Sequence, residues 1–186
     1  MKKTNYILIL AFLILVSCNK RKKEIAIDNV ELIELTDADQ NERKNSELDP
    51  KLIYVKDSLR REKVKVLESK KKLKTSNDFY NAALIFQHGR DSTDYLKALN
   101  FIKKSIELDS TRNKWLFAAI TDRYLLSIGK PQIYGTQYQK HGIDKPWRLG
   151  EIDTTKVSDD ERIEFGVETL EQQREKVKRL NKEGIN

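Results

Sequence analysis

The side chains best suited to chemistry lie in three short motifs near the middle of the sequence. They read Phe86-Gln87-His88-Gly89, then Trp115-Leu116-Phe117-Ala118-Ala119-Ile120-Thr121-Asp122-Arg123, and finally Pro131-Gln132-Ile133-Tyr134-Gly135-Thr136-Gln137. An imidazole near a carboxylate can move protons, and neighbouring amide and phenol groups can hold a ligand. We therefore take six residues as candidates for a site: His88, Asp122, Arg123, Gln132, Tyr134 and Gln137.

Three interpretations of these candidates stay open. His88 and Asp122 would serve as an acid–base pair in an enzyme, or the whole set would bind a ligand or a partner. In a purely structural role, Asp122 and Arg123 would bond the backbone of the following loop, because a charge on an apolar helix stripe is costly unless it is paired. His88 would then cap the end of its helix, and the two glutamines would pin the loop. One histidine without an evident nucleophile favours structure or binding over catalysis.

Several kinds of chemistry are excluded by composition and motif. One Cys and two His leave no set of ligands for a zinc site and no disulfide framework. The chain contains no phosphate-binding loop and no nucleophile elbow. We predict no metal and no cofactor.

The three motifs resemble a family of bacterial domains of unknown function. That family shares the His-Gly, Trp-x-x-Ala-Ala-x-x-Asp-Arg and Pro-Gln-x-Tyr-Gly-Thr-Gln elements, which this chain carries within residues 75–180. The resemblance implies a common domain. It carries no activity, substrate or cofactor with it.

The elements that position these residues are predicted to be mainly helices. Charged residues make up 35% of the 186 residues, and only 7 Gly and 3 Pro interrupt the chain. A long amphipathic helix is expected over 50–74, and three more begin near Ser76, Ser92 and Asn113. The stretch from Tyr80 to Asp109 resembles tetratricopeptide and Sel1-like repeats over about one and a half repeats, which implies helical hairpins.

One small β-hairpin and a split C-terminal helix complete the predicted fold. Aromatic residues between glycines favour pairing of 134–139 with 147–152. Ser158 and Glu161 have the spacing of a capping box, and Gly166 is a point where the last helical region would divide. The predicted fold class is thus mainly α, with a helical domain over 50–186.

The N-terminal segment has the features of an export signal. Lys2 and Lys3 precede an unbroken apolar run from Tyr6 to Val16, which is too short to span a bilayer. Its end, Leu15-Val16-Ser17-Cys18, resembles a bacterial lipobox, which implies cleavage after residue 17 and acylation of Cys18. Asn19 is not the Asp that resembles an inner-membrane retention signal, so an outer-membrane lipoprotein facing the periplasm is expected.

The net charge of +7 is unevenly distributed along the chain. Residues 20–23 carry +4, residues 24–49 carry −7, residues 51–74 carry +7, and residues 75–186 carry only +1. Residues 18–49 are expected to form a flexible tether with a short strand near 30–35. Alternating blocks in an exported chain argue against a nucleic-acid partner.

The sequence therefore predicts a lipid-anchored binding or scaffolding module whose partners are the membrane, through Cys18, and an envelope protein or a small ligand. Two alternatives remain. The first is an enzyme using His88 and Asp122, and the second is an assembly module acting through helix 50–74 or the C-terminal helix.

Overall fold

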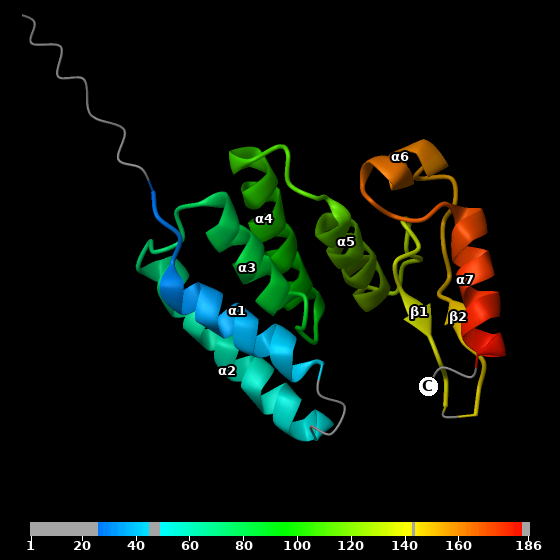
Figure 1. Ribbon diagram of the computed structural model, residues 1–186, viewed down its shortest axis with the longest axis horizontal. Helices are drawn as coiled ribbons and strands as arrows, with labels where there is room; N and C mark the ends of the chain where they lie inside the picture. The colour runs from blue at the N-terminus through cyan, green and yellow to red at the C-terminus, as the bar shows by residue number, and fades with distance from the viewer. Residues whose placement is uncertain (1–25, 45–48, 143, 184–186) are drawn as a thin grey trace, which may run out of the picture.

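The fold is mainly helical with one small antiparallel β-hairpin, as predicted (Figure 1). The computed structural model describes residues 26–44, 49–142 and 144–183. The first five helices are α1 (Val30–Glu42), α2 (Pro50–Ser69), α3 (Ser76–Phe86), α4 (Ser92–Leu108) and α5 (Trp115–Ser127). The strands β1 (Tyr138–Gln139) and β2 (Arg148–Leu149) follow, and then α6 (Asp159–Glu164) and α7 (Leu170–Lys182).

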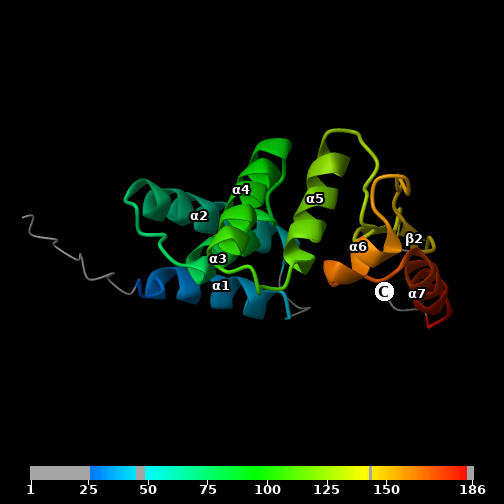
Figure 2. The ribbon, with the colours of Figure 1, turned by 90° about the horizontal axis from the view of Figure 1, so that it is seen from above.

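The central layer is the hairpin of α3 and α4. Thr75 begins α3 with a capping box that it shares with Asp78, and Asp91 begins α4 by accepting a hydrogen bond from the backbone N–H of Asp94. The rings of Phe86 and Phe101 meet edge to face between the two helices, with centroids 5.5 Å apart. Helix α5 packs on the far side of α4, which extends the row of helices (Figure 2).

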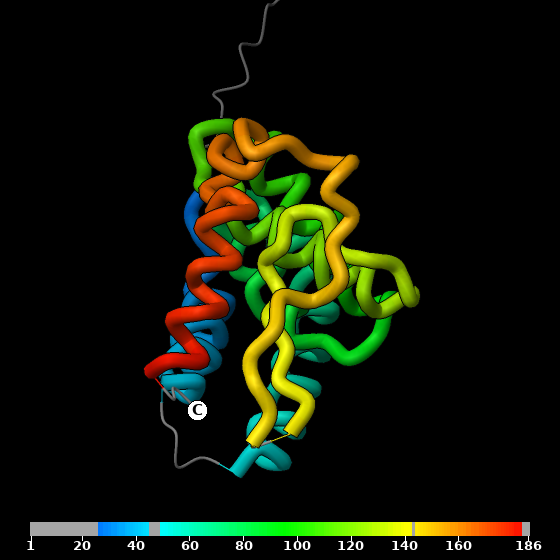
Figure 3. The backbone as a smooth tube through the Cα atoms, turned by 90° about the vertical axis from the view of Figure 1, so that its right-hand side faces the viewer, coloured from blue at the N-terminus to red at the C-terminus, as the bar shows by residue number. Residues whose placement is uncertain are grey.

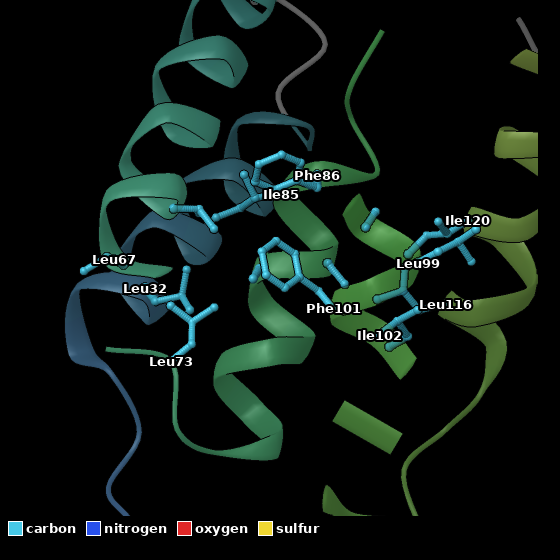
Figure 4. Close-up of a cluster of buried hydrophobic side chains, with 14 residues drawn as sticks. Leu32, Leu67, Leu73, Ile85, Phe86, Leu99, Phe101, Ile102, Leu116 and Ile120 are labelled. Carbon is cyan, nitrogen blue, oxygen red and sulfur yellow. The ribbon is translucent and has the colours of Figure 1, made fainter. Parts of the chain in front are cut away.

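The main hydrophobic core runs from α1 to α5 through this central layer (Figure 4). It contains Leu32, Leu67, Leu73, Ile85, Phe86, Leu99, Phe101, Ile102, Leu116 and Ile120. Leu32 is fully buried although it lies N-terminal to the long basic helix. The first described helix is therefore part of the folded body.

The expected tether is wrong for residues 30–42, and so is the short strand near 30–35. Asn29 caps α1 through its side chain, and the buried side of the helix places Leu32 in the core. The same side also carries Asp39, whose charge is compensated by Arg43, the residue that caps the end of α1, and by Arg60 on α2. A polar buried side hides the apolar periodicity that marks a helix in sequence. The helical domain thus begins at Val30 and not at residue 50.

The long basic helix is shorter than its expected range of 50–74. It ends at Ser69, and Lys71 adopts φ +54°, the left-handed conformation that terminates a helix. Chain direction then reverses so that Leu73 packs into the core.

The C-terminal part is a hairpin and two helices that pack beside α5. In the hairpin Tyr138 pairs with Leu149 and Gln139 with Arg148, so the strands are shorter than the predicted 134–139 and 147–152. Strand β2 and α7 lie side by side (Figure 3). Gly166, with φ +70°, separates α6 from α7, at the position where the sequence favoured a break.

None of the helices in the described ranges is long and apolar enough to cross a bilayer. The predicted signal peptide 1–17 and the acylated Cys18 lie outside the described residues.

Candidate functional site

Asp122 organises the loop that follows α5. Its side chain is fully buried. Oδ1 accepts hydrogen bonds from the backbone N–H groups of Ile133 and Tyr134, at 2.8 and 3.0 Å. Oδ2 accepts from the N–H and the hydroxyl of Thr136, at 2.9 and 2.7 Å. Four donors from one loop surround this carboxylate, so it anchors the loop and offers no free oxygen to a substrate.

Two side chains from the C-terminal helices hold the same loop from the other side. Arg162 is 1% exposed and donates to the carbonyls of Ile133, Tyr134 and Val157. Gln173 is fully buried, and its Nε2 donates to the carbonyl of Tyr134 at 2.8 Å. Because carbonyls on a buried loop need donors, these contacts fix the loop between α5 and α7.

Both glutamines of the motif also bond to the backbone. Gln132 is fully buried, and its Nε2 donates to the carbonyls of Gln137 and Gly150. Its Oε1 accepts the N–H of Gln137 at 2.9 Å, which ties the loop to β2. The side chain of Gln137 reaches the Thr136 hydroxyl and, at 3.5 Å, the carbonyl of Ala119.

Gly135 is the residue that lets this loop approach α7. Its φ is +86°, and a Cβ there would stand 1.9 Å from Oε1 of Gln173. That oxygen is buried without a hydrogen-bond partner, and it lies where a Cα–H of glycine can make a weak contact with it. Only glycine fits this position.

Tyr134 packs beneath the loop with its ring against Phe165, at a centroid distance of 5.2 Å. Its hydroxyl lies 3.4 Å from Glu161, and burial together with the negative charge of that carboxylate raises the pKa of the phenol. It therefore stays protonated and acts as a packing and hydrogen-bonding group.

His88 lies in a different cluster, at the end of α3. Its Nε2 is 3.5 Å from Oδ2 of Asp39 without hydrogen-bond alignment, and its carbonyl accepts from Arg61 at 3.1 Å. Burial lowers the pKa of the imidazole to about 3, and the nearby positive charge of Arg43 acts in the same direction. The imidazole is therefore neutral at ordinary pH and not in the charged form that the C-terminus of a helix favours.

A buried ionic cluster surrounds this histidine. Arg60, on α2, contacts Asp39 at 3.5 Å and Asp57 at 3.0 Å, and it also bonds Glu42. Arg43 bridges the same two aspartates at 3.1 and 2.7 Å. The cluster joins α1 to α2 and closes over the end of α3.

Arg123 is half-buried, within electrostatic range of Tyr95 and Arg43. Burial lowers the pKa of its guanidinium, the phenol of Tyr95 acts against this, and the Nε atom is buried without a hydrogen-bond partner. Among the described residues, none of the hydrogen bonds that hold the loop comes from Arg123, so the bond expected from the sequence is not found there.

The structure thus divides the six candidates. Asp122, Gln132, Tyr134 and Gln137 converge on one loop, whereas His88 and Arg123 lie towards the ionic cluster. Every hydrogen bond that Asp122 accepts comes from loop residues 133–136 and none from His88. The acid–base pair is not assembled.

Sequence reasoning missed the residues that complete this arrangement: Asp39, Arg60, Thr136, Arg162 and Gln173. The glycine next to Thr136 was the one local signal, because a glycine between polar residues marks a special backbone conformation. The partners themselves lie far away in sequence.

A small pocket opens beside the anchored loop. Its volume is about 180 Å³, and its lining includes Trp115, Thr136, Tyr138, Glu168 and Lys176. Lys176 pairs with Glu168 at 2.9 Å and stands 5.0 Å from the centroid of the Tyr138 ring. Burial and the neighbouring Glu168 carboxylate raise the pKa of Tyr138. The pocket is thus lined by Trp115, by an ion pair, and by two hydroxyls that already donate to carboxylates, Thr136 to Asp122 and Tyr138 to Glu168.

A larger groove of about 610 Å³ runs between α1 and α2. Its apolar lining includes Leu35, Ala38, Leu59, Val66 and Leu67, and charged residues form its rim. Among the described residues, no cluster of His, Cys, Asp and Glu is arranged to hold a metal ion.

Comparison with known proteins identifies the domain and no activity. No curated protein and no solved structure matches this chain. A family model, described as a family of unknown function (DUF6624), matches residues 62–182, which include α3, α4, α5 and the anchored loop. The chain therefore belongs to the family of unknown function DUF6624.

Proposed function

We propose that this chain is a lipid-anchored protein of the bacterial outer membrane that faces the periplasm and works there as a binding module. The lipobox-like segment ending at Cys18 supports the anchor. Two or three acyl chains hold a protein stably at a bilayer. Asp28 and Asn29 are already bonded to the start of α3, so nine residues lie between Cys18 and Asp28, the first bonded residue of the folded body. That length reaches at most about 35 Å.

The observation that carries the binding role is the pocket beside the anchored loop. The polar groups of the motif are consumed in fixing the loop, which places Thr136 and Tyr138 at the pocket wall. A rigid wall lowers the entropic cost of holding a ligand. The pocket volume corresponds to about six water molecules, enough for one amino-acid side chain or one sugar ring.

The chemistry of the wall indicates a polar, ring-bearing ligand group. Trp115 is 44% exposed and offers its indole face. Lys176 and Glu168 neutralise each other and present both a donor and acceptors. A neutral group with several hydroxyl or amide functions satisfies these partners best.

Affinity capture from the bacterial envelope tests the binding role. The intact acylated chain is compared with Trp115→Ala and Lys176→Ala, and both variants should lose the captured ligand. Lys178→Ala is the matched control, because Lys178 lies on the same helix and its ion pair with Glu175 is exposed. Equal capture by all four proteins would refute the pocket.

The anchor is tested separately. Labelling with a palmitate analogue should mark the wild type, and Cys18→Ser should lose both the label and its partition into membranes. A Cys18→Ser chain that is still processed and still partitions with membranes would contradict the anchor.

A further inference from the structure

The groove between α1 and α2 is an unpartnered surface. On α2, Leu52, Leu59 and Val66 recur every seven residues and are 44%, 60% and 48% exposed. Such a repeat forms the seam of a coiled coil or a helical bundle. Helices α1 and α2 form the outermost layer of the molecule, and α3 covers only their inner side (Figure 1). The exposed seam therefore continues the apolar lining of the groove.

The two walls of the groove carry opposite net charges. The α1 wall carries Glu31 and Glu42, whereas the α2 wall carries four bases and one acid: Lys56, Arg60, Lys63, Lys70 and Glu62. Lys56 pairs with Glu42 at 2.9 Å within the chain. At the other end of the groove, Glu31 and Lys70 are exposed to solvent. One acidic and one basic wall make a surface that is complementary to a copy of itself.

We infer that this groove binds the same groove of a second copy of the chain, so that the α1–α2 pairs of two chains form a four-helix bundle. The contact is isologous: α1 of one copy lies on α2 of the other, and the reverse contact is made at the same time. Each acidic wall then meets a basic wall, whereas α1 on α1 would oppose like charges. The apolar seam is buried in the bundle centre.

This pairing fixes the symmetry axis. Helices α1 and α2 are antiparallel, since Asn29 bonds the carbonyl of Lys72 at one end and Glu42 pairs with Lys56 at the other. Laying α1 on the partner's α2 across a two-fold axis requires that axis to run along the helices. Both copies of residue 30 then lie at the same end of the bundle. This geometry would let both chains be anchored in one bilayer. That consequence rests on the proposed function, whereas the dimer itself is inferred only from the groove and its charges.

Two other occupants fit the surface less well. An anionic membrane would be repelled by Glu31 and by the exposed Glu34 and Asp37 on the same helix. An acidic helix of another protein would match the lysines but would leave the α1 wall opposite like charge.

The first test measures mass in solution. The intact chain, solubilised in detergent, should sediment as a dimer at tens of micromolar, and Leu59→Ser should weaken the dimer at least tenfold. Ile163→Ser is the matched control, because Ile163 on α6 is also 60% exposed and lies far from the groove. A monomeric wild type, or equal loss in both variants, would overturn the inference.

Charge reversal separates a second copy from the other occupants. Glu31→Lys and Lys70→Glu should each weaken dimerisation about tenfold, and the double variant should restore it because both walls are reversed together. If Lys70→Glu weakens binding while Glu31→Lys strengthens it, the partner is an acidic surface and the inference is wrong. Helix content measured by circular dichroism confirms that each variant is folded.

Cysteine pairing tests the arrangement of the helices. The natural chain has one Cys, at position 18, so a disulfide between two introduced thiols can be recognised without interference from other cysteines in the chain. A chain carrying Glu31→Cys should cross-link to one carrying Lys70→Cys when both are co-expressed, and neither should cross-link to itself. Self-linked Glu31→Cys would mean that α1 lies on α1. Mass spectrometry of Cys18 keeps the two proposals apart: an acylated monomer refutes the dimer alone, and a dimer without acylation refutes the anchor alone.

Discussion

Replacing Asp122 by asparagine tests whether this carboxylate holds the loop. Asn has the same shape but presents one NH₂ group in place of an oxygen. Turned towards Thr136, that NH₂ keeps a bond to the hydroxyl, which can rotate to accept, and loses the backbone N–H that lies 2.9 Å from Oδ2. This orientation costs least, because the other one loses the N–H groups of Ile133 and Tyr134 together.

The expected loss of stability follows from these contacts. An unpaired buried N–H costs about 1–3 kcal/mol, and the bonds that remain fall from charge-assisted to neutral strength. The free energy of unfolding should therefore fall by about 3 kcal/mol. For a chain of this size that corresponds to a decrease in Tm of roughly 6–12 °C.

Thermal unfolding followed by circular dichroism measures this change, and hydrogen exchange locates it. The amides of Ile133, Tyr134 and Thr136 should exchange faster in Asp122→Asn. Asp37→Asn is the control, because Asp37 is exposed on α1. A decrease below about 1 kcal/mol, with unchanged exchange at the three amides, would refute the proposed anchoring role.

Three further perturbations test other parts of the structure. Burial holds the pKa of folded His88 at about 3, below its unfolded value of about 6.5, so the unfolded chain binds more protons between these values. The free energy of unfolding should thus fall as the pH drops below about 6.5, by about 2 kcal/mol at pH 5. Urea titrations should show this pH dependence in the wild type and in the control His141→Gln, and should not show it in His88→Gln. Arg60→Met removes a positive charge from two buried aspartates and should lower the free energy of unfolding, measured in urea, by about 3–5 kcal/mol. An unchanged free energy of unfolding would mean that the cluster is solvated. Gly135→Ala should lower the free energy of unfolding by at least about 1 kcal/mol, because the backbone φ is +86° and the new Cβ would meet Gln173. Adding Gln173→Ala should recover part of this loss, whereas strictly additive effects of the two substitutions would contradict the clash.

Local sequence signals were sufficient for most of the fold. The spacing of Ser158 and Glu161 and the glycine at 166 marked the C-terminal helices, and apolar periodicity marked α3 and α4. These features act within one or two turns, so one sequence contains them. Helix α1 was missed because its buried side carries Asp39, whose partner on α2, Arg60, follows 21 residues later.

The candidate site was predicted in part, for a related reason. The motifs pointed to the loop, and the cost of an unpaired charge on a helix stripe pointed to a structural role for Asp122. The surroundings of His88 and Arg123 depend on how α1 and α2 cover the end of α3. That packing is set by long-range ion pairs, which residue spacing does not reveal.

The contacts at the start of α1 have a mechanical consequence. Asp28 bonds Thr75 at 2.6 Å and Asn77 at 3.0 Å, and the N–H of Asn29 bonds Asp78 at 2.7 Å. A pull on the chain from its N-terminal side reaches these three bonds before it reaches the core. Because they converge on the first turn of α3, they share the load, and the force passes directly into the central hairpin. The N-terminal segment therefore resists being peeled away one contact at a time.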